Sequence, residues 1–136
     1  MYQKIIIPID LSHVEKAPQM VAAAKKLAGE DAKIWLVHAV EGLPGYAAAH
    51  VPGGVLETSR VSAREQLEKL ADELCAGAAV EVRDGKAATV VLDVAEENGA
   101  DAIVIASHRP DLSDYLLGST AARVVRHAQC TVVVLR

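Results

Sequence analysis

The sequence predicts an α/β protein with an open, doubly wound parallel sheet that helices cover on both faces. The chain has 136 residues, which is a typical length for one domain, here residues 1–136. Apolar runs alternate with segments of helical periodicity along the whole chain. The composition is 51% hydrophobic but only 3% aromatic, with no Phe. A core built from Ile, Val, Leu and Ala suits strands buried beneath alanine-lined helices.

The first strand is expected over residues 3–9, because the run IIIPI is apolar without alternation, as in a strand buried on both faces. Ser12 and Glu15 have the spacing of a capping box, which predicts a helix that begins at Ser12. Gly29 is expected to end this helix. Pro18 lies beyond the first turn of such a helix, so we expect an irregular first turn or a kink there.

The middle of the chain continues the alternation. Residues 33–40 (KIWLVHAV) predict the second strand, and residues 41–54 form a loop rich in Gly and Pro. A long helix is expected over residues 55–76, followed by a short strand over residues 79–83. The next helix is expected over residues 86–98, where Asn-Gly ends it.

The last part of the chain predicts a strand over Ala102–Ala106 (AIVIA) and a loop over residues 107–118. A helix over residues 119–128 and a final strand over Thr131–Leu135 (TVVVL) follow. The resulting βαβαβαβαβ order favours a parallel, doubly wound sheet. In such sheets, ligands bind beyond the carboxyl ends of the strands where the strand order reverses. This rule selects the loops after the first and fourth strands.

The loop after the fourth strand ends in Gly118-Ser119-Thr120 at the start of a helix. Unpaired N–H groups and the positive end of the helix dipole favour a phosphate there. Arg109 in the same loop adds donors. The alternative is that Ser119 merely caps the helix.

Asp10 follows the first strand, where its carboxylate can accept hydrogen bonds from ribose hydroxyls. Alternatively, it only favours the adjacent helix N-terminus. The five histidines show no metal-ligand spacing. His38 lies within a strand and is interpreted as a satisfied imidazole of the core or rim, whereas His108 lies in the candidate loop. Because HExxH, GxSxG and Walker A sequences are absent, we expect neither a catalytic residue nor a metal site.

Charge and composition exclude several classes of protein. The net charge of −4, the pI near 5.7 and the few aromatic residues argue against nucleic-acid binding. No apolar run approaches the ~20 residues that span a bilayer. Cys75 and Cys130 are far apart and are expected to be reduced thiols. Together with the lack of a signal-peptide layout, they predict a cytoplasmic protein that does not enter membranes.

Several separated motifs resemble the universal stress proteins in the right order. They are KIIIPIDLS, WLVHAV, VRDGKAATVVLDVAEENGADAIVIAS and the C-terminal stretch DAIVIASHRPDLSDYLLGSTAARVVRHAQCTVVVLR. The resemblance implies the strand order 3-2-1-4-5 and a homodimer largely through Thr131–Leu135, with a tetramer left open. It also implies a cytoplasmic stress-response role with a protein partner that the sequence does not identify. Many members bind ATP and others do not.

The ATP-binding branch carries the pattern G-x2-G-x9-G-[ST], from which this chain departs in the front half. Ala106 stands at the first Gly, and residues 107–110 are one residue short and have no second Gly. Non-glycine residues cost about 1 kcal/mol to enter left-handed conformations. Pro110 also lacks an N–H, although the five donors of Arg109 can replace lost amide contacts. Carried over by position, the resemblance implies nucleotide binding by Pro8, Ile9, Asp10, Ala39, Gly118, Ser119 and Thr120. The expected site also includes three residues of the variant loop, Ala106, His108 and Arg109.

Three functions remain open from the sequence. The leading one is a regulatory protein that binds ATP, with Mg²⁺ held by the phosphates, and acts through dimeric or higher assembly. The alternative is a homodimeric interaction module of the same fold that binds no nucleotide. Slow ATP hydrolysis is a third reading, for which Asp111, Asp114 and His108 are candidates only by their position in the sequence.

Overall fold

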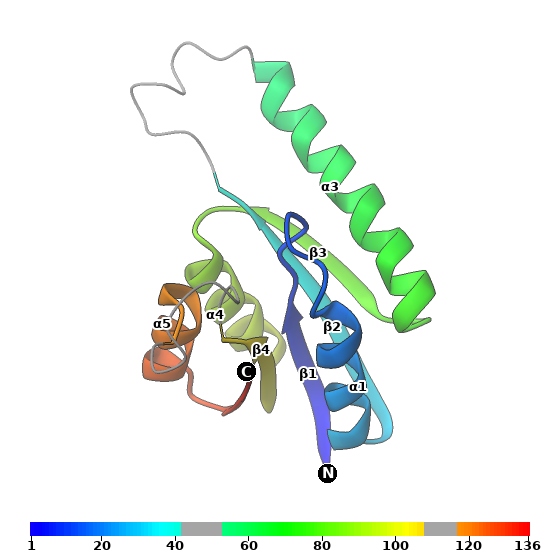
Figure 1. The fold of residues 1–136 in the computed structure, drawn as a ribbon, viewed down its shortest axis with the longest axis vertical. Coiled ribbons are helices and arrows are strands. Elements are labelled where there is room, and N and C mark those ends of the chain that lie inside the picture. The colour runs from blue at the N-terminus through cyan, green and yellow to red at the C-terminus, as the bar shows by residue number, and fades with distance from the viewer. Residues whose placement is uncertain (42–52, 108–116) are drawn as a thin grey trace.

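A five-stranded parallel sheet of order β3-β2-β1-β4-β5 forms the middle layer of the protein (Figure 1). The structure, a computed structural model, describes residues 1–41, 53–107 and 117–136, and for residues 53–57 it describes the backbone only. The elements follow one another as β1 (Tyr2–Pro8), α1 (Ala17–Leu27), β2 (Ala28–Val40), α3 (Gly53–Leu74), β3 (Ala79–Asp84), α4 (Ala87–Asn98), β4 (Ala102–Ala106), α5 (Ser119–His127) and β5 (Thr131–Leu135). The predicted α/β class and strand order are therefore confirmed.

Two helical layers bury the two faces of this sheet. Helices α1 and α3 pack on one face, and α4 and α5 pack on the other (Figure 1). Ile5 and Ile7 face the α1/α3 layer, whereas Ile6 faces the α4/α5 layer, and all three are completely buried. Burial on both faces explains why the strand shows no alternation of apolar and polar residues.

The start of α1 differs from the prediction. The helix begins at Ala17, and its N-cap Lys16 makes no side-chain capping hydrogen bond, so the capping box predicted at Ser12 is wrong. Pro18 is the physical reason, because in a helix that began at Ser12 it would lack the N–H needed in the interior. In the observed helix Pro18 lies in the first turn, where no such N–H is required. The conflict is thus resolved by a later start of the helix, and not by the irregular first turn or kink that the sequence predicted.

The end of α1 also differs. The helix stops at Leu27 and the chain enters β2 at Ala28, earlier than the predicted strand start at residue 33. Gly29 does not take the left-handed conformation of a helix stop. Asp31 does, with a φ of 62°. Strand β2 pairs with β1 through a register shift between Tyr2 and Lys4, so its early part is an irregular extension of the ladder. At the end of α4, by contrast, Gly99 is left-handed with a φ of 65°, as predicted.

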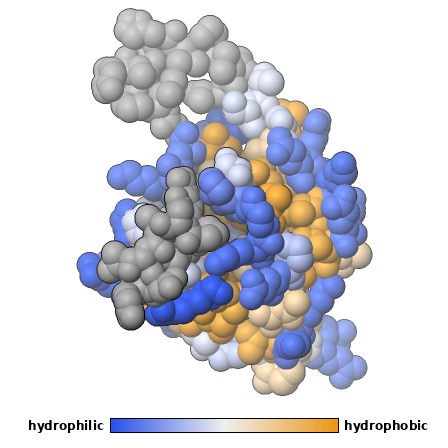
Figure 2. All heavy atoms as spheres, viewed as in Figure 1, coloured by the Kyte–Doolittle hydropathy of each residue, from blue (hydrophilic) through white to orange (hydrophobic). Residues whose placement is uncertain are grey.

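Polar side chains cover much of the face seen in Figure 2. The large apolar side chains that are exposed belong to separate elements and loops. None of the helices in the described ranges combines the length and the hydrophobicity needed to cross a bilayer.

The carboxylate of Asp101 joins the starts of β1 and β4. Its Oδ2 accepts the N–H of Gln3 and its Oδ1 accepts the N–H of Lys4, both at 2.9 Å. Partial burial acts to raise the pKa of Asp101. The two backbone hydrogen bonds outweigh that effect, so the pKa lies below its ordinary value. The ionised side chain therefore stabilises the folded state.

We expect Asp101→Asn to lower the free energy of unfolding at pH 7 by about 1 kcal/mol, because the charged acceptor is lost at a partly exposed site. The folded pKa lies below the unfolded one. The stabilisation is therefore present above the unfolded pKa of about 4 and is lost as the pH falls through the folded value. Urea denaturation of both proteins at pH 7 and at pH 3 measures the difference, which should narrow at pH 3. Asp93→Asn, on the exposed side of α4, is the matched control. An undiminished difference at pH 3 would contradict the assignment.

Candidate functional site

The strand order reverses between β1 and β4, and Asp10 follows β1 at this point. Ile9 extends the ladder, because its N–H donates to the carbonyl of Val37 at 2.8 Å. The side chain of Asp10 is 61% exposed. Its Oδ1 accepts the N–H of Ser12 at 2.9 Å, and its Oδ2 lies 3.2 Å from Nδ1 of His13. A carboxylate accepts about four hydrogen bonds. Asp10 can therefore bind a ligand donor at the rim while it holds this turn.

Helix α5 begins on the other side of the reversal point. Gly118 is its N-cap, with extended φ and ψ of −61° and 156°, and a glycine has no side chain that could cap the helix. The possibility that Ser119 serves only as the cap is therefore wrong. Ser119 is the first residue of the helix, and the first N–H bonded within it is that of Ala122, to the carbonyl of Gly118 at 2.9 Å. The N–H groups of Ser119, Thr120 and Ala121 thus form the open end of the helix.

The main chain of Ser107 holds this helix start at the end of β4. Its carbonyl accepts the N–H of Gly118, and its own N–H donates to the carbonyl of Leu135, both at 2.8 Å. Ser107 is 4% exposed. One buried residue therefore links the start of α5 with the end of β5.

The structure brings together part of the predicted site. Residues at or just after the carboxyl ends of β1, β2 and β4 share one edge of the sheet with the start of α5. The residues predicted from the sequence that lie at this edge are Pro8, Ile9, Asp10, Ala39, Ala106, Gly118, Ser119 and Thr120. His108 and Arg109 lie outside the described residues, as do Asp111 and Asp114.

Consecutive residues of β2 face opposite layers. Ala39 packs with the α4/α5 cluster and pairs with Arg83 of β3. His38 lies on the α1/α3 side, where it is half-buried. Its Nδ1 is 2.9 Å from the carbonyl oxygen of Ile9. The interpretation of His38 as a satisfied imidazole is therefore confirmed, and the described ranges contain no cluster of metal-ligating side chains.

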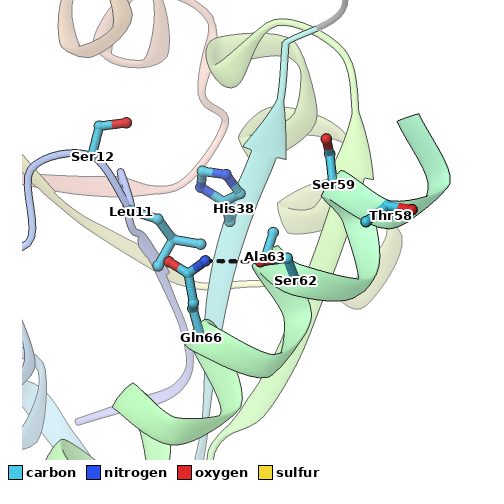
Figure 3. Close-up of a pocket in the computed structure, with 8 residues that line it drawn as sticks. All are labelled: Leu11, Ser12, His38, Thr58, Ser59, Ser62, Ala63 and Gln66. Carbon is cyan, nitrogen blue, oxygen red and sulfur yellow. Dashed lines mark hydrogen bonds between the residues drawn. The ribbon is translucent and has the colours of Figure 1, made fainter. Parts of the chain in front are cut away.

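A pocket of about 440 Å³ opens between the turn after β1, the end of β2 and the first half of α3 (Figure 3). The imidazole of His38 lies between the turn and the helix. On α3, Nε2 of Gln66 donates to Oγ of Ser62 at 3.1 Å. The lining residues are Leu11, Ser12, His38, Thr58, Ser59, Ser62, Ala63 and Gln66.

The α3 wall of this pocket was not predicted from the sequence. Ser59, Ser62 and Gln66 are spaced by three and four residues, which places them on one face of a helix. This spacing was a usable signal for a polar face. Only the folded chain shows that this face of α3 lies opposite His38 and the turn after β1.

Comparison with known proteins gives a consistent result. The model of the Universal stress protein family matches residues 1–136. Universal stress protein G of Shigella flexneri is 34% identical, in an alignment that covers 100% of both chains. Universal stress protein UspA from Lactobacillus plantarum superimposes with a TM-score of 0.77 at 22% identity, covering 99% of this chain and 98% of that one. A universal stress protein in complex with cAMP has a TM-score of 0.65 at 21% identity, covering 99% and 97%. At these identities the two structures support the fold alone.

Proposed function

Because the chain belongs to the universal stress protein family, we propose that it is a stress-response regulatory protein that binds ATP and acts through dimeric or higher assembly. The proposed site is the crevice between the loops after β1 and β4. One observation carries the proposal: the open N-terminus of α5 is held at the end of β4, across the reversal point from the exposed carboxylate of Asp10.

The phosphates are assigned to the start of α5. The N–H groups of Ser119, Thr120 and Ala121 precede the first hydrogen bond within the helix, so they are the donors a phosphate needs. The hydroxyls of Ser119 and Thr120 add two further donors. Mg²⁺ would be held through the phosphates, and Arg109 remains the cation proposed from the sequence. We assign no hydrolytic role to this site, because its candidate bases rest on sequence position alone.

The ribose is assigned to Asp10. The carboxylate has acceptor capacity beyond its bonds to Ser12 and His13, and ribose hydroxyls are donors. A nucleotide ligand is also supported by the relative solved in complex with cAMP, since cAMP contains the same base and sugar as ATP.

Assembly is assigned to β5, an edge strand of the sheet among the described residues. The carbonyl of Leu135 is bonded to Ser107, so the main-chain groups of alternate residues Thr131, Val133 and Leu135 point toward β4. Those of Val132 and Val134 point away from the sheet. An apolar strand with outward N–H and C=O groups favours pairing with a second copy. We propose a homodimer through Thr131–Leu135, with a tetramer as a further step.

Ser107 offers a physical route between the two proposed functions. Its carbonyl holds the start of α5, where the phosphates are assigned, and its N–H holds the end of the dimer strand. A phosphate that shifts the start of α5 would act on the end of β5 through this residue. Any coupling is reciprocal, so dimerisation would change the affinity for ATP by the same factor by which ATP changes the affinity of dimerisation.

A cytoplasmic location is part of the proposal, and the two free thiols, Cys75 and Cys130, are consistent with it.

Calorimetric titration of the purified, nucleotide-free protein with ATP and Mg²⁺ tests the proposal. We expect saturable binding, which Asp10→Ala should weaken about tenfold or more because hydrogen bonds to a charged acceptor are lost. Asp93→Ala on α4 is the control and should bind as the wild-type protein does. Thermal melting of each variant distinguishes lost binding from lost folding. If the wild-type protein shows no saturable binding, the alternative of a homodimeric interaction module without nucleotide takes the place of the proposal.

A further inference from the structure

We propose that the ion pair between Arg60 of α3 and Asp84 at the end of β3 is a latch. It holds the first part of α3, residues 58–62, against the sheet, and it thereby controls how fast a ligand enters and leaves the pocket beside this part of the helix. The control of ligand exchange rests on the proposed nucleotide binding, whereas the latch itself does not. Arg60 and Asp84 are positioning residues in this proposal, and neither is assigned a contact with the ligand.

The first part of α3 lies outside the packed core. Ala63, Leu67 and Ala71 are buried at intervals of four residues, whereas none of residues 58–62 is buried and Val61 is 53% exposed. The first half of the helix extends past the ends of the strands (Figure 1). The helix also begins with two glycines, which have a low helix propensity. A helix end with few buried apolar contacts opens locally at a low cost in free energy.

Arg60 lies on the side of α3 that faces the sheet. It precedes Ala63 by three residues and Leu67 by seven, so the helical period places it in line with the buried residues. At this position a charged side chain stands where the packed half of the helix has apolar ones. Its Nη1 donates to Oδ2 of Asp84, and both side chains are about half exposed. Here the helix meets the sheet through an ion pair that solvent can reach.

Asp84 is the fixed partner of this ion pair. It is paired with Val40 of β2, and the N–H of the next residue, Gly85, donates to the carbonyl of Val40 at 3.0 Å. Gly85 has a φ of 136°, a conformation that favours glycine, and the chain then crosses to α4 on the other face of the sheet. Because the backbone around Asp84 is held in the sheet, loss of the ion pair frees the first part of α3 and not the strand.

The same part of α3 forms a wall of the pocket. Thr58, Ser59 and Ser62 line it opposite the turn after β1, whereas Arg60 is not a lining residue (Figure 3). A change at Arg60 can therefore release the wall without removing a group that lines the pocket. A wall that opens more often lets a ligand pass in both directions. The latch should thus slow association and dissociation by similar factors and leave the affinity nearly unchanged.

The expected size of the effect follows from the exposure of the pair. Breaking an exposed ion pair shifts an equilibrium by about two- to fivefold, which is small against the stability of a whole domain. For a segment that opens on its own, the same factor multiplies the open population directly. Salt screens exposed charges, so the effect should disappear at high ionic strength.

Amide hydrogen exchange of the nucleotide-free protein, followed by mass spectrometry, tests the latch. We expect residues 58–64 to exchange about two- to fivefold faster in Arg60→Gln and in Asp84→Asn. The double variant should exchange no faster than the single ones, because the same pair is already broken. Addition of 1 M NaCl should remove the difference from the wild-type protein. Arg64→Gln is the matched control, since it breaks an exposed ion pair with Glu68 inside α3 and keeps the link to the sheet.

NMR line-shape analysis of a titration with ATP and Mg²⁺ tests the control of ligand exchange. In Arg60→Gln we expect the association and dissociation rate constants to rise together by about two- to fivefold, while the dissociation constant stays within about twofold of the wild-type value. Arg64→Gln should keep both rate constants. A residue that merely stabilised the fold or touched the ligand would not raise both rates at constant affinity.

The outcomes separate the latch from the proposed function. Wild-type amide exchange in Arg60→Gln, or effects of the two single variants that multiply in the double variant, overturns the latch whether or not ATP binds. If the wild-type protein does not bind ATP, the proposed function and the control of ligand exchange are overturned, while hydrogen exchange still decides on the latch. Faster amide exchange with unchanged rate constants for ATP overturns the control of ligand exchange.

Discussion

Replacement of Ile103 by alanine is expected to lower the free energy of unfolding by about 2–5 kcal/mol, the usual cost of a truncated core isoleucine. Ile103 is completely buried in β4, beside Ile6 of β1 and Val132 of β5. Its side chain belongs to the core beneath α4 and α5. Since strands hold it on both sides, the surroundings can collapse only partly around the cavity, and much of the lost packing is not regained.

Urea denaturation followed by circular dichroism measures this effect. Ile103→Val should cost less, about 0.5–1.5 kcal/mol, because one methyl group is removed instead of three carbon atoms. Val61→Ala is the control, since Val61 on α3 is 53% exposed and its loss should change stability by no more than about 0.5 kcal/mol. A loss at Ile103 as small as that at Val61 would show that this part of the sheet is not packed as described.

Val134→Pro is expected to dissociate the proposed homodimer while the subunit stays folded. The N–H of Val134 points away from β4, so proline removes a donor from the outer edge of the sheet without breaking the ladder inside it. In a symmetric β5–β5 interface the change occurs twice. With about 1–3 kcal/mol for each carbonyl left without a donor, dimerisation should weaken by about 2–6 kcal/mol.

Sedimentation equilibrium over a range of concentrations measures the dissociation constant, and circular dichroism checks the fold. Val133→Pro is the matched comparison, because the N–H of Val133 points toward β4 and its loss should destabilise the subunit itself. A wild-type protein that is monomeric at all concentrations would remove the proposed interface. A Val134→Pro dimer of undiminished stability would place the interface on another surface.

Much of the fold could be predicted because its signals are local. The apolar runs of β4 and β5 predicted the bounds of both strands, and Asn98-Gly99 predicted the end of α4. One wrong prediction arose where two local signals conflicted. A capping box and a proline competed at the start of α1, and the proline prevailed because a missing N–H in a helix interior costs more than a lost cap.

The candidate site was predictable on one side only. Asp10 and Gly118-Ser119-Thr120 could be selected from the sequence because each follows a strand or begins a helix in a recognisable pattern. The α3 wall was missed because Ser62 and Gln66 resemble the solvated face of any helix. Their role in a pocket depends on α3 lying opposite His38, which is a contact between segments far apart in the chain.

The sequence by itself therefore determined the α/β class, the order of the elements and the residues at the carboxyl ends of the strands. These features depend on hydrophobic periodicity and turn chemistry within short segments. Only the tertiary structure decided that Ser107 joins the start of α5 to the end of β5, and that Ile9 orients the imidazole of His38. Hydrogen bonds between distant segments depend on how the layers pack, and no local pattern specifies that packing.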